Sequence, residues 1–201
     1  MEHSPSQPLS SPKLILASAS PRRCELLEQI GVRYRVVAAA LDEQQLRDES
    51  PGQCVQRLAL AKAQHVRERA GSSAAVVLGA DTAVVLEGRM LGKPADRDEH
   101  LRMMSALSGR VHQVLTAVAV VSTRAESVCL SESQVQLREL SAAEALAYWA
   151  TGEPADKAGG YAIQEHGDLI VSEISGSYTN VVGLPLERLS EELEKWDGAA
   201  V

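Results

Sequence analysis

The sequence lacks features that would place it in several common protein classes. It has no phenylalanine and only 3% aromatic residues, so its core must be built from Leu, Val, Ile and Ala. Its three cysteines form no CxxC pair, which argues against a disulfide framework or a zinc site and indicates a reducing compartment, the cytoplasm. The longest apolar run, 114–121, is interrupted by Thr116 and is far shorter than the roughly 20 residues of a membrane helix, so no membrane partner is expected.

The chain also lacks an excess of positive charge. Twenty Lys and Arg stand against 27 Asp and Glu, which gives a net charge of −7. Because phosphate neutralisation supplies most non-specific nucleic-acid affinity, we expect no nucleic-acid partner. An anionic ligand would need a local cluster of basic side chains. The 45% hydrophobic share is enough for a folded core and is typical of an α/β protein.

The order of predicted elements favours an α/β fold with a mixed sheet. Residues 1–12 are polar and rich in Pro and Ser, and we interpret them as a disordered leader before a single domain over 13–201. Strands are expected at 13–17, 34–38, 74–79, 84–86, 89–91, 111–122, 128–137, 161–164 and 169–174. Helices are expected after the caps Ser20, Ser50, Asp96 and Ser141, and over 186–196.

The first candidate site is the strand-to-helix junction Ser18–Arg23, which carries two hydroxyls and two guanidinium groups. A helix start favours anions, and arginine is well shaped for phosphate. The segment is interpreted equally well as a capped helix with two solvated arginines.

Further candidates follow along the chain. Asp81 is expected at the end of an apolar strand, where α/β proteins place ligands, and it has the chemistry to bind Mg²⁺ or activate water. Lys93, between Gly92 and Pro94, offers a point charge for phosphate, although no P-loop frame surrounds it. An aspartate turn and a surface lysine are the simpler interpretations of these two residues.

Four other residues have both a functional and a structural interpretation. Lys62 lies on the apolar stripe of its helix, where it would either meet a ligand or cover apolar surface with its stem. Asp42 and Glu43 form a carboxylate pair that, together with Asp81, would complete an oxygen shell for a hard cation; a solvated loop is the alternative. Gln164 would present its amide to a base edge or simply end a strand. The five histidines show no metal-binding spacing.

Taken together, these segments resemble the Maf family of nucleoside triphosphate pyrophosphatases. The matching stretches are LILASASPRRCELLEQIG, VQRLALAKA, LGADTAVVLEGRMLGKP, SGRVHQVLTAVAV, GEPADKAGGYAIQ and ISGSYTNVVGLPL, which cover about 14–186. The resemblance implies an elongated mixed β-sheet flanked by helices, as in inosine triphosphate pyrophosphatases, with a cleft between two lobes and usually a homodimer. It implies hydrolysis of a nucleoside triphosphate to the monophosphate and pyrophosphate with Mg²⁺ or Mn²⁺.

The resemblance also implies roles for single residues. Asp81 would be the proton acceptor and, with Glu43, a metal ligand. Phosphate contacts would come from Ser18, Arg23, Lys62 and Lys93. Substrate specificity would depend on Arg22, Thr82 and Gln164, a combination similar to that of the dTTP/UTP subgroup, although modified pyrimidine nucleotides stay open as substrates. Glu165 and His166 depart from the family pattern beside Gln164.

Two other functions remain open on this evidence. Family members also carry the label of a nucleotide-binding regulator of cell division or septum formation, which would bind with little turnover. A purine-directed inosine triphosphate pyrophosphatase of related architecture is the second, against which the combination of Arg22, Thr82 and Gln164 speaks. The intact acidic and basic set favours an enzyme, since a pure binding protein does not need a water-activating carboxylate.

Overall fold

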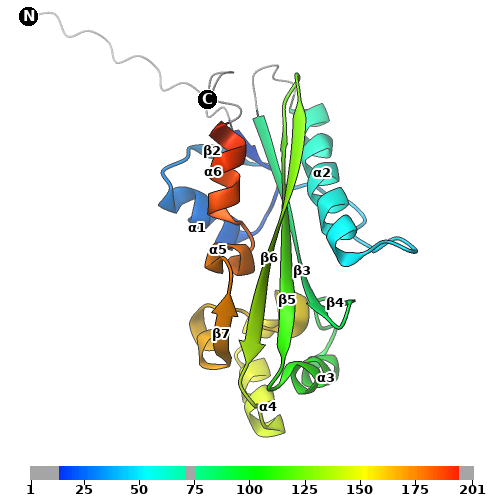
Figure 1. The fold of residues 1–201 in the computed structure, drawn as a ribbon, viewed down its shortest axis with the longest axis vertical. Helices are drawn as coiled ribbons and strands as arrows, with labels where there is room; N and C mark the ends of the chain where they lie inside the picture. Colours follow the sequence, from blue (N-terminus) through cyan, green and yellow to red (C-terminus); the bar gives the residue numbers. More distant parts are fainter. Residues whose placement is uncertain (1–13, 71–75, 195–201) are drawn as a thin grey trace, which may run out of the picture.

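The computed structural model describes residues 14–70 and 76–194, which form an elongated α/β fold (Figure 1). The predicted leader and the start of the strand expected at 74–79 lie outside the described residues. No helix within the described ranges has the length and apolarity to cross a membrane. In chain order the elements are β1 Leu14–Leu16, α1 Pro21–Gln29, β2 Tyr34–Val36, α2 Pro51–Arg69, β3 Val76–Leu86, β4 Arg89–Leu91, α3 Arg97–Leu107, β5 Val111–Val121, β6 Glu126–Leu137, α4 Ala142–Ala150, β7 Val171–Ser175, α5 Tyr178–Val182 and α6 Leu186–Glu194.

The strands form one seven-stranded mixed sheet, as the alternation of predicted elements indicated. Its order is β2-β1-β3-β5-β6-β7, and β4 pairs with β3 outside this path. The short strand β1 is parallel to both β2 and β3, whereas the other pairs are antiparallel. The long strands β3, β5 and β6 run along the long axis of the molecule (Figure 1). A mixed sheet arises because parallel strands need crossover helices, whereas β3 to β6 include direct hairpins.

Alternate residues of β3 face two different layers of the core. Val77, Ala83 and Val85 pack in one apolar cluster with the buried stripe of α2. Leu78 and Val84 pack in the other cluster, with buried side chains of α1, α3 and α6. Because neighbouring side chains of a strand point to opposite faces, Asp81 belongs to the α2 face and Thr82 to the other. This division organises the site.

Helix starts follow the predicted capping chemistry at three places out of four. Ser50 and Ser141 form complete capping boxes with Gln53 and Glu144. Asp96 accepts a hydrogen bond from the Glu99 amide. Ser20 precedes α1, but its side chain makes no capping bond, and Pro21 alone provides the expected start.

The prediction that Asp81 ends a strand is wrong. The segments expected at 74–79 and 84–86 belong to one continuous strand, β3, and Asp81 lies in its middle. The Ala80–Ala83 stretch stays extended because β5 pairs with it throughout. The hairpin around Glu87 and Gly88 is confirmed, with φ of 51° and 78° at these residues, as a tight hairpin turn requires.

The predicted hairpin over 161–164 and 169–174 is also wrong. Residues 161–164 form no strand; a 3-10 helix spans Glu165–Leu169, and β7 pairs with β6 instead. Gly167 permits this turn, because a Cβ there would lie only 2.0 Å from the Ala162 carbonyl oxygen. The sequence analysis also missed α5, whose Ser177 cap accepts a hydrogen bond from the Asn180 amide. Of the helix expected over 186–196, the last two residues lie outside the described chain.

Candidate active site

A cleft of about 390 Å³ opens at an interruption in the sheet. On one edge of β3, β1 pairs with 76–78 and β4 pairs with 84–86. Within the described residues no strand pairs with this edge between them, and the cleft lies beside that interval. Side chains from both faces of β3 therefore reach one cavity.

All nine residues to which the family resemblance gives a role line this cleft. They are Ser18, Arg22, Arg23, Glu43, Lys62, Asp81, Thr82, Lys93 and Gln164. They come from the β1–α1 loop, the first turn of α1, the loop before α2, α2 itself, β3, the segment after β4 and the segment before β7. The structure also adds lining residues that were not predicted as functional, among them Tyr161 and Gly183.

On the α2 face, one lysine joins two carboxylates. The Lys62 ammonium lies 2.6 Å from Asp81 Oδ1 and 2.7 Å from Glu43 Oε1. The Lys62 and Asp81 side chains are only 9% and 11% exposed, whereas Glu43 is 54% exposed. Burial raises the pKa of the Asp81 carboxyl from its ordinary value, and the charges of Lys62 and Arg23 oppose that shift. A carboxylate with a raised pKa is a stronger proton acceptor.

Gly79 sets the distance between α2 and β3 at this point. A Cβ at Gly79 would lie 2.1 Å from the Ala59 carbonyl oxygen and 2.9 Å from the Ala63 nitrogen. The helix backbone therefore packs directly against the strand backbone, which only glycine permits. Lys62 lies between these two helix residues, and Asp81 lies two residues beyond Gly79 on the same face. This close packing brings the buried ammonium to the buried carboxylate.

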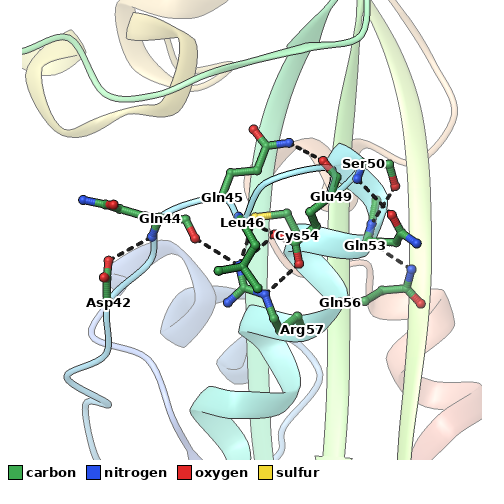
Figure 2. A network of polar contacts seen from close by, with 11 residues as sticks. Asp42, Gln44, Gln45, Leu46, Glu49, Ser50, Gln53, Cys54, Gln56 and Arg57 are labelled. Carbon is green, nitrogen blue, oxygen red and sulfur yellow. Dashed lines mark hydrogen bonds and ion pairs between the residues drawn. The ribbon is translucent and has the colours of Figure 1, made fainter.

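The loop that carries Glu43 is held by Arg57 of α2 (Figure 2). Arg57 donates to both carboxylate oxygens of Glu49, at 2.6 and 2.9 Å, and to the Gln44 carbonyl oxygen at 3.0 Å. The amide of Leu46 donates to Glu49 as well. The Arg57 pair lowers the pKa of Glu49 to about 2. Sequence reasoning missed Arg57, although its place on the helix of Lys62, two residues after Val55, was visible.

On the opposite face, Arg23 is buried among neutral acceptors. It donates from Nε to the Gly183 carbonyl oxygen at 2.8 Å, from Nη1 to Ser18 Oγ at 3.0 Å and from Nη2 to Thr82 Oγ1 at 3.1 Å. Burial lowers the pKa of the guanidinium, and the charge of Asp81 opposes this shift. None of the three acceptors carries a charge, so Arg23 presents its positive charge to the cleft with no carboxylate bonded to it in these contacts, and Asp81 acts on it only from a longer distance.

Ser18 is left with a single free hydrogen-bonding capacity. Its oxygen accepts from Arg23 Nη1 and from the Ser20 amide, at 3.0 and 3.2 Å. A hydroxyl has two acceptor lone pairs and one donor hydrogen. The Ser18 hydrogen is therefore available for an acceptor in the cleft, such as a phosphate oxygen.

The segment before Gln164 is fixed by a hydrogen-bond network that the sequence analysis did not anticipate. The Tyr148 hydroxyl accepts from the Ala162 amide at 3.0 Å and donates to Glu153 at 3.1 Å. The other carboxylate oxygen of Glu153 accepts from the His166 amide and lies 3.3 Å from His166 Nδ1. The histidine that departs from the family pattern thus pairs with Glu153. Gln164 is half-buried and lines the cleft between these anchored residues.

The donor set of the cleft fits a hard divalent cation that shares its coordination with a substrate. No group of three or more His, Cys, Asp and Glu suited to a metal occurs in the part of the chain that the structure describes. The two carboxylates of Asp81 and Glu43 are close enough to share one ammonium. Mg²⁺ commonly takes one or two carboxylates and fills its remaining positions with water and phosphate oxygens. Asp42, the third carboxylate considered for a cation, does not line the cleft, and its carboxylate accepts a hydrogen bond from the Gln44 amide.

Comparison with known proteins gives consistent matches over almost the whole chain. The family described as Maf-like protein matches residues 13–196. A protein of Saccharophagus degradans named dTTP/UTP pyrophosphatase is 52% identical over 88% of this chain and 85% of its own. Proteins of the same name from Alkalilimnicola ehrlichii and Symbiobacterium thermophilum are 47% and 49% identical, over 95% and 92% of this chain and 96% and 94% of theirs.

Proposed function

Because the chain belongs to the Maf family, we propose that it is a dTTP/UTP pyrophosphatase, a hydrolase that converts these nucleotides to the monophosphate and pyrophosphate. The observation that carries the proposal is the cleft, where the buried carboxylate of Asp81 lies among the cationic side chains of Arg23, Lys62 and Lys93. An acidic chain needs such a local cluster to hold a triphosphate.

In the proposed reaction Asp81 is the proton acceptor for the attacking water. Its raised pKa suits this role, because general bases work best when their pKa approaches the working pH. Before substrate and metal bind, Lys62 holds the carboxylate in place through its 2.6 Å contact. No covalent intermediate on the protein is required.

Asp81 and Glu43 are the proposed ligands of a divalent cation, Mg²⁺ or Mn²⁺, which when bound would polarise the α-phosphate and neutralise its charge. The Lys62 ammonium contacts both carboxylates in this structure and would shift towards the phosphates when the cation binds. Its flexible stem allows this shift, and its ammonium is a strong point-charge partner for phosphate oxygens.

The remaining phosphate contacts are assigned to residues with free donors. Arg23 has two N–H hydrogens beyond its three bonds, and Ser18 has its hydroxyl hydrogen. Lys93 is exposed and Arg22 half-buried in the wall of the cleft, which gives them freedom to follow the triphosphate. Arg22 also belongs to the residues assigned to substrate specificity.

Gln164 is the proposed base-reading residue. Its amide has one acceptor and two donors, which match N3–H and O4 of uracil and thymine together. Cytosine presents the inverse pattern, and an unpaired buried polar group is costly. UTP and dTTP should therefore react at similar rates, with CTP, ATP and GTP much slower.

A substrate panel tests the proposal directly. Pyrophosphate release would be measured for the five nucleotides, with Mg²⁺ and with Mn²⁺, and modified pyrimidine triphosphates would be added next. Release from dTTP and UTP supports the enzyme. Saturable nucleotide binding without release would overturn it in favour of the regulator, and a preference for inosine triphosphate would favour the purine-directed activity.

Gln164→Glu tests the base contact separately. The second acceptor would face O4 of the base, so turnover of UTP and dTTP should fall about tenfold or more. Gln134→Glu, on an exposed position of β6, makes the same change in charge away from the cleft and serves as the control. An unaltered rate and nucleotide preference in Gln164→Glu would refute the contact and leave the phosphate chemistry standing.

The proposal includes a cytoplasmic homodimer. The family resemblance implies the dimer, and the odd number of cysteines without a CxxC pair supports a reducing compartment. Light scattering of the purified protein would measure its mass in solution.

A further inference from the structure

A chain of hydroxyl groups leads from Arg23 away from the cleft. Arg23 Nη2 lies 3.1 Å from Thr82 Oγ1, which lies 3.0 Å from Thr116 Oγ1, which lies 2.8 Å from the Asn180 carbonyl oxygen. Thr116, on β5, is completely buried and does not line the cleft. The four groups belong to α1, β3, β5 and α5 and lie on the face of β3 opposite Asp81.

The two ends of this chain fix the direction of every hydrogen in it. A guanidinium only donates, so Thr82 Oγ1 accepts from Arg23. A carbonyl oxygen only accepts, so the Thr116 hydroxyl donates its hydrogen to the Asn180 carbonyl oxygen. Thr116 then has only acceptor capacity for Thr82, and Thr82 must donate to Thr116. The hydrogen of Thr82 therefore points away from the cleft.

From this direction we propose that Thr82 and Thr116 are positioning residues that hold Arg23 for phosphate binding, and that Thr82 does not donate a hydrogen bond to the base. The inference rests on the proposed function, because Arg23 acts there as a phosphate ligand. It adds a positioning role to the substrate selection that the family resemblance implies for Thr82, whose oxygen keeps a second acceptor lone pair.

The far end of the chain is itself immobilised. The Asn180 side-chain amide donates to the Val114 carbonyl oxygen at 3.0 Å and to Ser133 Oγ at 2.9 Å. Gly183, three residues on, accepts from Arg23 Nε. The helix α5 thus fixes the guanidinium at two edges, once directly and once through Thr116 and Thr82. A guanidinium held in one plane loses little conformational freedom when it binds a phosphate.

Thr116→Val tests this chain of hydrogen bonds, because it keeps the shape of the side chain and removes the hydroxyl. We expect kcat/KM for both dTTP and UTP to fall about fivefold to tenfold, mainly through a higher KM, with the nucleotide preference unchanged. Thr116→Ser should restore most of the loss. Thr82→Val should lower kcat/KM by a similar factor, which keeps the test decisive if one variant folds poorly. Thr179→Val is the matched control, since its hydroxyl bonds to Ser177, Glu187 and the Leu186 amide but not to Arg23.

A double-mutant cycle shows whether the effect passes through Arg23. In an Arg23→Ala background, Thr116→Val should cause almost no additional loss. An equal loss in both backgrounds would overturn the hydrogen-bond chain as the route of the effect, and so would unchanged kcat/KM in both valine variants. If instead the wild type releases no pyrophosphate, the proposed function fails first and this inference fails with it. If Arg23→Ala is fully active, the proposed function stands, and the role of Arg23 as a phosphate ligand fails together with this inference.

Discussion

The two faces of β3 hold their cations in opposite ways. On the α2 face, Lys62 is shared by the carboxylates of Asp81 and Glu43, so its charge is already compensated. On the other face, Arg23 is held by two hydroxyl oxygens and a carbonyl oxygen, none of which carries a charge. Neutral acceptors orient a cation without consuming its attraction for an anion, whereas carboxylates create a group that another cation can enter. The neutral acceptors around Arg23 therefore suit the binding of a phosphate, and the carboxylates around Lys62 suit the binding of a metal ion.

Asp81→Asn removes the buried carboxylate on the α2 face and should have the largest effect. Asparagine keeps the size of the side chain but loses the charge and the basicity, so kcat for dTTP should fall by about 10²–10⁴-fold with the fold intact. Steady-state pyrophosphate release and circular dichroism would check both points. A near wild-type rate would remove Asp81 from its assigned role.

Acid should protonate a buried histidine on the face of β3 that holds Arg23. Buried His112 contacts the Tyr161 hydroxyl at 2.5 Å, and burial lowers the pKa of its imidazole to about 4. Because the folded state disfavours the protonated form, the full stability is present above the unfolded pKa, about 6.5, and is lost as the pH falls towards 4. The loss should approach about 2–3 kcal/mol at pH 4.5.

Urea unfolding at pH 7.5 and pH 4.5 would measure this loss, with His112→Gln as the reference. The free energy of unfolding of the variant should depend less on pH than that of the wild type. Equal pH dependence in the two proteins would mean that His112 titrates normally despite its burial.

Arg23→Ala removes the guanidinium that neutral acceptors hold and should reduce kcat/KM by about 10- to 100-fold, the value of a charged hydrogen bond to phosphate. Lys93→Ala should act in the same direction through a single exposed contact. Arg89→Ala, at an exposed position of β4, removes an equal charge outside the cleft. Unchanged kcat/KM in both cleft variants would remove Arg23 and Lys93 from phosphate binding.

Lys62→Met should raise the affinity of the Asp81 and Glu43 carboxylates for a metal ion. Without the ammonium, Asp81 and Glu43 repel each other, and a divalent cation relieves that repulsion, so Mn²⁺ affinity in the absence of nucleotide should rise about tenfold. Electron paramagnetic resonance of unbound Mn²⁺ would measure it, with Arg89→Met as the control for charge. Equal Mn²⁺ affinity in wild type and Lys62→Met would argue against the two carboxylates as ligands.

Local chemistry in the sequence predicted much of the fold. The caps at Ser50 and Ser141, the aliphatic stripe of α2 and the hairpin at Glu87 and Gly88 depend on neighbours within a few residues, and the structure confirms them. The 161–164 segment failed this approach, because its conformation depends on Tyr148 and on the packing of Gly167 against Ala162. No local pattern reports such contacts.

The residues of the cleft could be named from the sequence, but their arrangement could not. The position of Asp81 within β3 depends on pairing with β5, more than 30 residues later. The division of Asp81 and Thr82 between two faces follows from that pairing. Arg57 and Thr116 act through other residues and carry no motif of their own, so only their contacts reveal them.

Gly79 also determines how far the aliphatic core around α2 can be substituted without disturbing the cleft. Because the helix and strand backbones touch there, the spacing between α2 and β3 is set by main-chain atoms and not by the volume of side chains. Exchanges among the aliphatic residues around Val55 and Val66 can therefore accumulate during evolution while the ammonium and carboxylate stay in register. The same contact makes Gly79 intolerant of any larger residue, so the freedom of the surrounding core depends on the constancy of one position.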